Sequence, residues 1–313
     1  MTNKSIRVFA PATVANVTCG FDILGFAIDN PGDEIIVTLI SNHGSNIVIK
    51  EITGDNGILP YDPNKNTVTV SILKLLEHIK SDVSLEITLH KKMPLGSGLG
   101  SSAASSAAAV VAVNELLGFG LARKDLIVFA MEGERVASGS AHADNVAPSI
   151  LGGFTLIRSN EPLDVVKITT PKDLYASVIH PHIEINTRDA RSIVRQTVPL
   201  KKAIKQWGNI AGLIAGLTMS DYELIGRSMQ DVIIEPARSI LLPGFDSVKK
   251  AAMTNNAIGC GISGSGPSIF AISRGFDTAK SVAIAMLNEF KNINIEGEIF
   301  ISKINSDGCK ILD

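Results

Sequence analysis

The sequence predicts a protein of the α+β class with two domains. The chain has 313 residues, which at roughly 100–200 residues per domain suggests two domains or one large one. Segments typical of strands and of helices are mixed in both halves of the chain. Hydrophobic residues make up 45% and charged residues 19%, which is ordinary for a soluble globular protein that builds a core. Because aromatic residues are only 5%, we expect a core of Ile, Val, Leu and Ala.

In the first half, strand-like and helical segments follow one another. Asp33–Ile40 and Asn46–Ile52 are rich in β-branched residues, and Val83–Leu89 alternates as a half-buried strand does. Apolar residues three and four apart predict a helix over Asn64–Lys80 behind an Asn cap, and alanine predicts a helix over Ala103–Leu117. The other elements expected here are strands at Ser5–Ala10 and Gly152–Arg158 and a helix at Arg123–Ser138.

The second half continues the mixture after Ser159–Leu163, which is the best candidate for a linker. We therefore divide the chain into an N-terminal domain, 1–158, and a C-terminal domain, 159–313. A glycine loop lies between two β-like runs within Ile258–Ser273. The other expected elements are strands near Leu174–His180 and Ile295–Ile304, and helices near Leu200–Met219, Asp221–Ile233, Phe245–Asn255 and Asp277–Lys291.

Charge and composition exclude several classes of partner. The net charge is −2 and no basic run occurs, so we expect no nucleic acid partner. The uncharged stretch Met93–Asn114 is interrupted by proline, glycine and serine and is too short in its apolar part to span a bilayer, so we expect no membrane contact. The N-terminus has no apolar signal-peptide core, and the three cysteines form no CxxC pair. Both features favour a cytoplasmic protein.

The most informative segment is PLGSGLGSSAA, residues 94–104, which follows a predicted strand and opens the Ala-rich helix. Glycines let the backbone aim several N–H groups at one point, and a helix N-terminus adds free donors and a positive dipole end. The segment therefore predicts a cradle for a triphosphate; the alternative is a plain turn that starts a helix. The residues assigned to this phosphate loop are Pro94, Leu95, Gly96, Ser97, Gly98, Leu99, Gly100, Ser101, Ser102, Ala103 and Ala104.

Two other phosphate motifs were considered for the same segment. The Walker pattern GxxxxGK[ST] does not occur in it. The dinucleotide pattern GxGxxA fits Gly98, Gly100 and Ala103. However, a second predicted helix follows the Ala-rich one, in place of a strand that ends in an acidic residue. Hydride transfer with a dinucleotide is therefore the alternative from another enzyme class.

Two further loops have unusual composition. Pro11–Gly25, PATVANVTCGFDILG, places polar residues in a loop flanked by apolar ones. Near the other end, GCGISGSGPSIF over 259–270 alternates glycine with serine between two β-like runs, which favours a close approach of backbone to a ligand. A simple β-turn is the alternative. The residues singled out in this third loop are Gly261, Ser263, Gly264, Ser265 and Gly266.

In this order along the chain, the three loops resemble the three motifs of the GHMP kinases, the superfamily named for galactokinase, homoserine kinase, mevalonate kinase and phosphomevalonate kinase. The resemblance covers essentially the whole chain. It is strongest to the homoserine kinase branch, through APATVANVTCGFDILG, GERVASGSAHADNVAPSILGG, TRDAR at Thr187–Arg191 and EPARSILLPGF at Glu235–Phe245.

The resemblance implies a fold and a reaction. The N-terminal domain would bind ATP and contain a left-handed βαβ unit, and the C-terminal domain would be ferredoxin-like. With ATP and Mg²⁺, the enzyme would phosphorylate the side-chain hydroxyl of L-homoserine to give O-phospho-L-homoserine for threonine biosynthesis. Members of the family often form homodimers. The remaining alternatives are a sibling kinase for another small alcohol and a relative that binds ligands without catalysis.

The resemblance also implies which residues hold the substrate. Arginines grip a carboxylate through forked hydrogen bonds, and an aspartate is a counter-charge for an ammonium group. The matching positions in this sequence are Asn16, Asp22, His142, Asn145, Arg191 and Arg238. Each of these residues has a structural alternative, such as a turn former or a solvated charge.

Three positions concern the metal and the chemical step. In the family, a glutamate that matches Glu134 holds Mg²⁺ together with a serine of the phosphate loop, here Ser101 or Ser102. Several relatives use an Asp as catalytic base, and Asn145 occupies that position here. The resemblance therefore implies transfer without a strong base, which a loose transition state tolerates. The adjacent Asp144 is expected to point elsewhere and receives no role.

Overall fold

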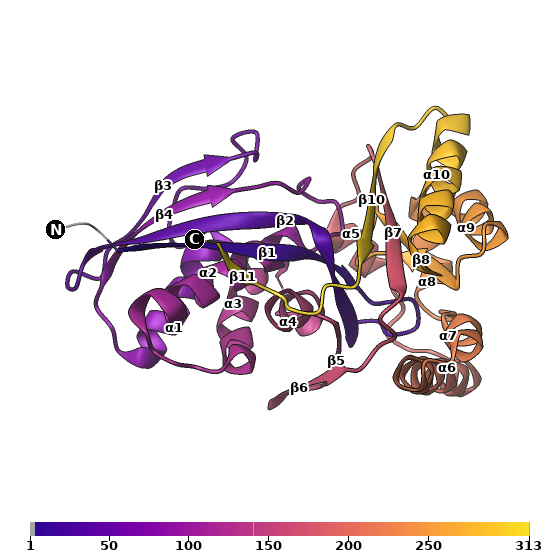
Figure 1. Ribbon diagram of the computed structural model, residues 1–313, viewed down its shortest axis with the longest axis horizontal. Coiled ribbons are helices and arrows are strands. Elements are labelled where there is room, and N and C mark those ends of the chain that lie inside the picture. Colours follow the sequence, from indigo (N-terminus) through magenta and orange to yellow (C-terminus); the bar gives the residue numbers. More distant parts are fainter. Residues whose placement is uncertain (1–3, 140, 313) are drawn as a thin grey trace.

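The computed structural model describes residues 4–139 and 141–312. The molecule is elongated and consists of two lobes (Figure 1). In the first lobe a long sheet is covered by helices on one side, and in the second lobe a smaller sheet is packed against two helices. This arrangement confirms the predicted α+β class with two domains.

The sheet of the first lobe has the order β11-β1-β2-β4-β3, and the β5–β6 hairpin extends it from β2. Strands β3 and β4 run parallel on either side of α1, so they form a βαβ unit. The other strands of this sheet pair antiparallel. The strands span Ser5–Ala15 (β1), Leu24–Ser41 (β2), Ile47–Thr53 (β3), Ser84–His90 (β4), Phe154–Asn160 (β5), Leu163–Ile168 (β6) and Lys310–Leu312 (β11).

Helix α2 occupies the centre of the first lobe, between the sheet and the other helices. Nearly all of its residues are buried, which explains why the sequence has alanine, valine and serine on every face. Small side chains let this helix lie close to two layers of neighbours at once. The helices here are α1 (Thr67–Ile79), α2 (Ser101–Leu117), η1 (Arg123–Leu126), α3 (Ile127–Ser138) and α4 (Ala143–Leu151).

The second lobe has the strand order β10-β7-β9-β8 and the chain order β-α-β-β-α-β, which is the predicted ferredoxin-like arrangement. Its elements are β7 (Leu174–Pro181), α9 (Phe245–Thr254), β8 (Gly259–Ile262), β9 (Ile269–Arg274), α10 (Phe276–Asn292) and β10 (Gly297–Lys303). Between β7 and α9 the chain adds α5 (Thr187–Ser192), α6 (Leu200–Met219), α7 (Tyr222–Ser228), α8 (Glu235–Arg238) and η2 (Ser239–Leu241).

A cluster of three aromatic rings joins the two sheets. Phe26 of β2 stacks on Phe154 of β5 with ring centroids 4.7 Å apart, and Phe26 and Phe270 of β9 form a T-shaped pair with ring centroids 5.7 Å apart. All three side chains are fully buried. The two lobes therefore share part of one hydrophobic core, which fixes how their loops meet.

The predicted linker at Ser159–Leu163 is wrong. This segment is the turn of the β5–β6 hairpin and connects two strands of the same sheet. The last strand, β11, also returns to the first sheet beside β1. Strands β6 and β11 thus belong to the sheet of the first lobe, although they lie beyond residue 158. The division of the chain into domains 1–158 and 159–313 stays a prediction.

Most other predicted elements are confirmed within a few residues, and α6 has the predicted bounds. The helix predicted over Asp221–Ile233 ends early, because α7 covers only Tyr222–Ser228. Helix α4 was not predicted. It carries Pro148 in its interior, which is unfavourable in a helix by local preference and is tolerated here where the helix is buried against the sheet.

Candidate active site

The three predicted loops meet where the two lobes join. The first motif, Pro11–Gly25, begins on β1 rather than in a loop, and the backbone N–H of Thr13 near the end of that strand donates to the carbonyl of Leu99 in the phosphate loop at 3.0 Å. The hydroxyl of Ser263, in the third loop, donates to the carbonyl of Gly98 at 2.7 Å. Segments about 85 and 165 residues apart in the sequence are thus joined around the start of α2.

The first loop has an unusual backbone. Asn16, Val17 and Thr18 all have positive φ, at 70°, 38° and 59°. The Asn16 side chain stabilises this turn, since its Nδ2 donates to the Gly264 carbonyl at 2.8 Å and its Oδ1 accepts from the backbone N–H of Asp22 at 3.0 Å. Such left-handed conformations cost energy for residues with side chains and typically occur at functional loops.

Helix α2 begins without a side-chain cap. Its N-cap residue is Gly100, with φ 67° and ψ 32°, and no side chain accepts a hydrogen bond there. The first N–H groups of a helix have no partner within the helix, and the helix dipole makes this end positive. Gly96 and Gly98 before it also have positive φ. This loop therefore has the form of an anion site open for phosphate.

A buried ion pair supports this helix start from below. Lys91 donates to Asp33, to the Ser101 carbonyl at 2.9 Å and to the Ser105 hydroxyl at 2.8 Å. Asp33 also accepts from the hydroxyls of Ser101 and Ser105 and from the backbone N–H groups of residues 92 and 93. Both side chains are almost fully buried, at 2% and 0% exposure. The sequence analysis missed this pair, because neither residue belongs to a motif.

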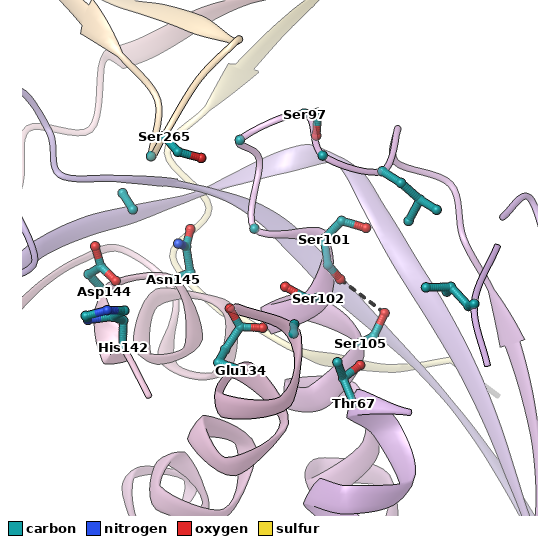
Figure 2. Close-up of a pocket in the computed structure, with 18 of the residues that line it drawn as sticks. Thr67, Ser97, Ser101, Ser102, Ser105, Glu134, His142, Asp144, Asn145 and Ser265 are labelled. Atoms are coloured by element: carbon teal, nitrogen blue, oxygen red, sulfur yellow. Dashed lines mark hydrogen bonds between the residues drawn. The ribbon is translucent and has the colours of Figure 1, made fainter. Parts of the chain in front are cut away.

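The loops enclose one cavity of about 460 Å³ (Figure 2). All residues predicted for the substrate and the metal line it, together with most of the phosphate loop. The predicted residues in the lining are Asn16, Asp22, Leu95, Gly96, Ser97, Gly98, Gly100, Ser101, Ser102, Glu134, His142, Asn145, Arg191, Arg238, Gly264 and Ser265.

Seven predicted residues are not part of the lining. Pro94 precedes the lining residues of the phosphate loop, Gly261 lies in β8 and Gly266 has a φ of 83°. Ser263 holds the phosphate loop through Gly98. The remaining three have fully buried side chains that belong to the hydrophobic core: Leu99, Ala103 and Ala104. For these three, only backbone groups are available to a ligand.

Two arginines lie at one end of the cavity. Arg238 is buried, and its guanidinium donates to the carbonyls of Ala190 and Gly264, both at 3.0 Å. Burial lowers the pKa of Arg238 from its ordinary value, because the protein around the guanidinium disfavours its charged form. Arg191 is half exposed and forms an ion pair with Asp22 at 2.6 Å. The opposite charges of Arg191 and Asp22 thus neutralise each other at this end of the cavity.

His142 and Asn145 lie beside this charged end. Nδ1 of His142 is 3.9 Å from a carboxylate oxygen of Asp22, and burial lowers the pKa of the imidazole, so the neutral form dominates at pH 7. The Oδ1 atom of Asn145 accepts a hydrogen bond from the Thr13 hydroxyl at 2.7 Å. This contact fixes the amide and directs its NH₂ group away from Thr13.

Glu134 faces Ser102 near the middle of the cavity (Figure 2). The carboxyl group is buried and hydrogen-bonded to the Ser102 side chain. Burial raises the pKa of Glu134, and the bond to Ser102 opposes that effect. The hydroxyl of Ser101 instead donates to Asp33 at 3.2 Å. Of the two serines proposed for the metal, Ser102 is therefore the one adjacent to the glutamate.

The expectation that Asp144 points away from the site is wrong. Its side chain lines the cavity beside His142 (Figure 2). Burial, with Asp22 and Glu134 nearby, raises the pKa of Asp144 from 3.8 to about 7. Asp144 and Asn145 are adjacent in the first turn of α4, which the sequence analysis did not predict, so the direction of either side chain could not be inferred.

The far end of the cavity is lined by residues to which the sequence analysis gave no role. Ile58, Leu59 and Pro60 form an apolar wall, and Asn66 and Thr67 at the start of α1 lie next to it. Asn66 is occupied as the cap of α1, since its Oδ1 accepts from the backbone N–H of Val68. These residues follow β3 in a loop without glycine–serine motifs, so no pattern identified them.

Comparison with known proteins agrees with this geometry. Residues 66–153 match the family model described as GHMP kinases N terminal domain, and residues 202–292 match GHMP kinases C terminal. A homoserine kinase of Chlorobium phaeobacteroides is 50% identical over 99% of this chain and 100% of its own length. A homoserine kinase of Xylella fastidiosa is 36% identical, over 99% of this chain and 95% of its own.

Solved structures give the same result. A homoserine kinase of Cytophaga hutchinsonii superposes with a TM-score of 0.96 at 57% identity, over 100% of this chain and 98% of that one. The mevalonate kinase of L. major, at 14% identity and a TM-score of 0.70 over 97% and 96% of the two chains, shares the fold alone.

This chain belongs to the GHMP kinase family, whose members are ATP-dependent kinases. Within that family it groups with the homoserine kinases. Among residues 4–139 and 141–312, no helix combines the length and apolarity needed to cross a membrane.

The glycine at the start of α2 gives a first test. A Cβ at Gly100 would lie 2.1 Å from Oγ1 of Thr13 and 2.7 Å from Oδ1 of Asn145, whereas a Cβ at Gly96 would meet nothing within 4 Å. Both glycines have nearly the same φ, +67° and +68°. Gly100→Ala should therefore weaken binding of a nonhydrolysable ATP analogue by about 10–100-fold, because it displaces the helix start. Calorimetric titration measures the affinity.

Gly96→Ala is the matched control for this experiment. It carries the same backbone cost, roughly 1–2 kcal/mol, without the steric clash. Its ATP analogue affinity should stay within a few-fold of wild type. Equal losses in the two variants would mean that the contact of Gly100 with Thr13 and Asn145 does not position the phosphate loop.

Asp144 gives a test by pH. Its pKa of about 7 in the folded chain exceeds the ordinary 3.8, so the folded state holds the proton more tightly than the unfolded state does. The free energy of unfolding should therefore fall as pH rises from about 4 to about 7 and then level off. Asp144→Asn removes this effect, so the variant should gain stability relative to wild type over that window. Denaturant unfolding at several pH values measures the difference.

The exposed Asp277→Asn change serves as the control for Asp144→Asn, because Asp277 lies at the solvent-exposed start of α10. The stability of the Asp277→Asn variant relative to wild type should not rise over the pH range in which Asp144 titrates. If the Asp144→Asn difference were the same at every pH, the Asp144 carboxyl would not titrate as its burial requires.

Proposed function

We propose that this chain is a homoserine kinase, which transfers the γ-phosphoryl group of ATP to the side-chain hydroxyl of L-homoserine and releases O-phospho-L-homoserine and ADP. One geometric observation supports it most: a single cavity is lined both by an uncapped helix start and by a pair of arginines. The first suits a polyphosphate and the second a carboxylate. Relatives named homoserine kinase at about half identity over the full chain support the same substrate.

The carboxylate and ammonium groups of an amino acid match the charged residues at the arginine end of the cavity. The substrate carboxylate would bind Arg238 and Arg191, and its ammonium group would bind Asp22. The ion pair between Arg191 and Asp22 would then be replaced by one contact from each residue to the substrate. No net charge is buried in this exchange, because a zwitterion replaces an ion pair. Asn16 holds the loop that carries Asp22.

The transfer itself would rely on position and charge. The phosphate loop would hold the triphosphate, and the substrate hydroxyl would lie next to Asn145 and the neutral His142. Neither group is a strong base, which agrees with a reaction in which the γ-phosphoryl group is nearly free before the new bond forms. Asp144 lies beside them, and its raised pKa keeps it partly protonated near pH 7.

The residues beside the phosphate loop fit Mg²⁺. The hydroxyl of Ser102 and the buried carboxylate of Glu134 are adjacent oxygen ligands, the type that Mg²⁺ prefers, and the nucleotide phosphates would complete its shell. When bound, the ion would neutralise charge on the phosphates. No group of three His, Cys, Asp or Glu side chains in the described residues could hold a metal without phosphate.

We also propose a cytoplasmic homodimer. The three cysteines are buried and unpaired as disulfides, with thiol pKa values raised by burial to between about 11 and about 12. A reducing compartment suits them. The dimer is supported by the family resemblance.

A substrate panel tests the proposed activity. Purified protein with MgATP should release ADP when L-homoserine is added, measured by a coupled assay, and the product should be O-phospho-L-homoserine by mass spectrometry. Turnover with mevalonate or galactose in place of L-homoserine would favour a sibling kinase. Binding of both ATP and homoserine without ADP release would favour a relative without catalysis, and binding of a nicotinamide dinucleotide would favour hydride transfer.

Arg238→Leu tests the arginine end. Loss of two charge-assisted hydrogen bonds, each about 1.5–3 kcal/mol, should raise the homoserine KM by about 100-fold or more and leave the ATP KM near normal. Steady-state kinetics with each substrate varied in turn measures the split.

Arg238→Lys is the control for charge. It keeps the positive charge but loses the fork, so the KM for homoserine should lie between those of wild type and Arg238→Leu. A loss of ATP affinity as large as the loss of homoserine affinity would contradict the assignment of this residue to the substrate.

A further inference from the structure

Helix α6 carries an apolar stripe on its outer face. Leu200, Ile204, Trp207 and Met219 are 67%, 56%, 58% and 71% exposed, and Trp207 is the single tryptophan of the chain. The first three follow one another at spacings of four and three, so they share one face of the helix. Figure 1 shows α6 at the margin of the second lobe with α7 packed beside it. Single exposed apolar residues are ordinary, but a continuous stripe on one helix marks an interaction surface.

Small residues continue this stripe at the middle of the helix. Gly208 and Ala211 are exposed, Ala215 is partly exposed, and nothing lies within 4 Å of a Cβ built on Gly208. Large residues lie toward the start and at the end of the 20-residue helix. A helix with small residues at its centre allows another helix to cross there at short distance.

The charges on α6 are unfavourable for an isolated helix. Lys201, Lys202 and Lys205 lie in its first two turns, at the positive end of the helix dipole, and the helix contains no acidic residue. Just beyond its C-terminus the chain has Asp221 and the exposed Glu223. The negative end of a second helix, placed against the lysines, would neutralise them.

We propose that α6 of one chain packs antiparallel against α6 of a second copy, across a two-fold axis near Ala211. The stripe is self-complementary in this arrangement. Ile204 faces the region of Met219 in the partner copy, Gly208 faces the region of Ala215, and the lysines lie near the negative C-terminal end that precedes Glu223. A partner of another kind would need both an apolar stripe and this charge order. This inference rests on the proposed homodimer and assigns its interface.

The face of α6 opposite the apolar stripe contacts the first loop of the candidate active site. Buried Gln206 donates to the Cys19 carbonyl of the first loop and to Asp231, both at 2.9 Å. The same helix therefore carries the dimer surface on one side and holds the loop with Asn16 and Asp22 on the other. Packing by a second copy would brace that loop from behind.

The test is the self-association of the full chain by analytical ultracentrifugation. Wild type should be a dimer. Replacing Ile204 and Trp207 together by Glu should raise the dimer dissociation constant at least about 30-fold, since a buried tryptophan at an interface centre typically contributes that much. Ile284→Glu, at a 44% exposed apolar position on α10, is the matched control and should leave the dimer unchanged.

The outcomes separate the two proposals. A monomeric wild type at every concentration would overturn both the dimer and its interface. A dimer that the double Glu variant leaves intact, or that Ile284→Glu weakens equally, would overturn the α6 interface alone.

A cysteine placed on the axis gives a second test that leaves the large apolar residues of the stripe unchanged. Because the axis passes near Ala211, Ala211→Cys should form a disulfide-linked dimer under mild oxidation, while the three native cysteines are buried. Ser281→Cys, on the exposed face of α10, is the control and should stay monomeric on a nonreducing gel. Absence of the cross-link at 211, or equal cross-linking at 281, would overturn the proposed axis.

Discussion

The arrangement of the site depends on the buried ion pair between Asp33 and Lys91. It joins the strand that ends at His90, the strand that contains Asp33 and the first turn of α2. The pair fixes the position of the first turn of α2, because it binds the carbonyl of Ser101 and the hydroxyls of Ser101 and Ser105. Removal of one partner of such a pair costs about 3–5 kcal/mol, because a charge is left buried alone. The N–H groups above it remain available to a ligand, which is the property that a phosphate site requires.

The second constraint is that every part of the site comes from a different region of the chain. The first loop lies between two strands of the large sheet, the phosphate loop precedes α2, and the third loop joins β8 to β9 in the other lobe. Phe26, Phe154 and Phe270 bring the two sheets together, and hydrogen bonds of Asn16 and Ser263 then join the loops. The cavity is thus lined both by charged side chains of opposite sign and by the start of α2, and under the proposed function these would bind the amino acid and the triphosphate respectively.

The sequence predicted the fold class, most elements and just over half of the residues that line the cavity, because motifs with glycine and serine report backbone geometry directly. It did not predict what depends on tertiary packing. Asp33 and Lys91 are ordinary charged residues in sequence, and only burial makes them a structural pair. The expectation that Asp144 points elsewhere was wrong because its direction depends on α4, a buried helix that carries Pro148 and that the sequence did not predict. The SNEPL segment has the composition of a linker, yet strand pairing makes it a hairpin turn. The loop that contains Ile58, Leu59 and Pro60 has a sequence typical of a surface turn.

The central claim is that the first turn of α2 and the loop before it bind the triphosphate of ATP. A crystal structure of the protein with a nonhydrolysable ATP analogue and Mg²⁺ tests it most directly. The account predicts phosphate oxygens within hydrogen-bond distance of backbone N–H groups between Gly96 and Ser102, with the metal next to Ser102 and Glu134. A triphosphate bound elsewhere in the molecule, with this loop free of the nucleotide, would contradict the account.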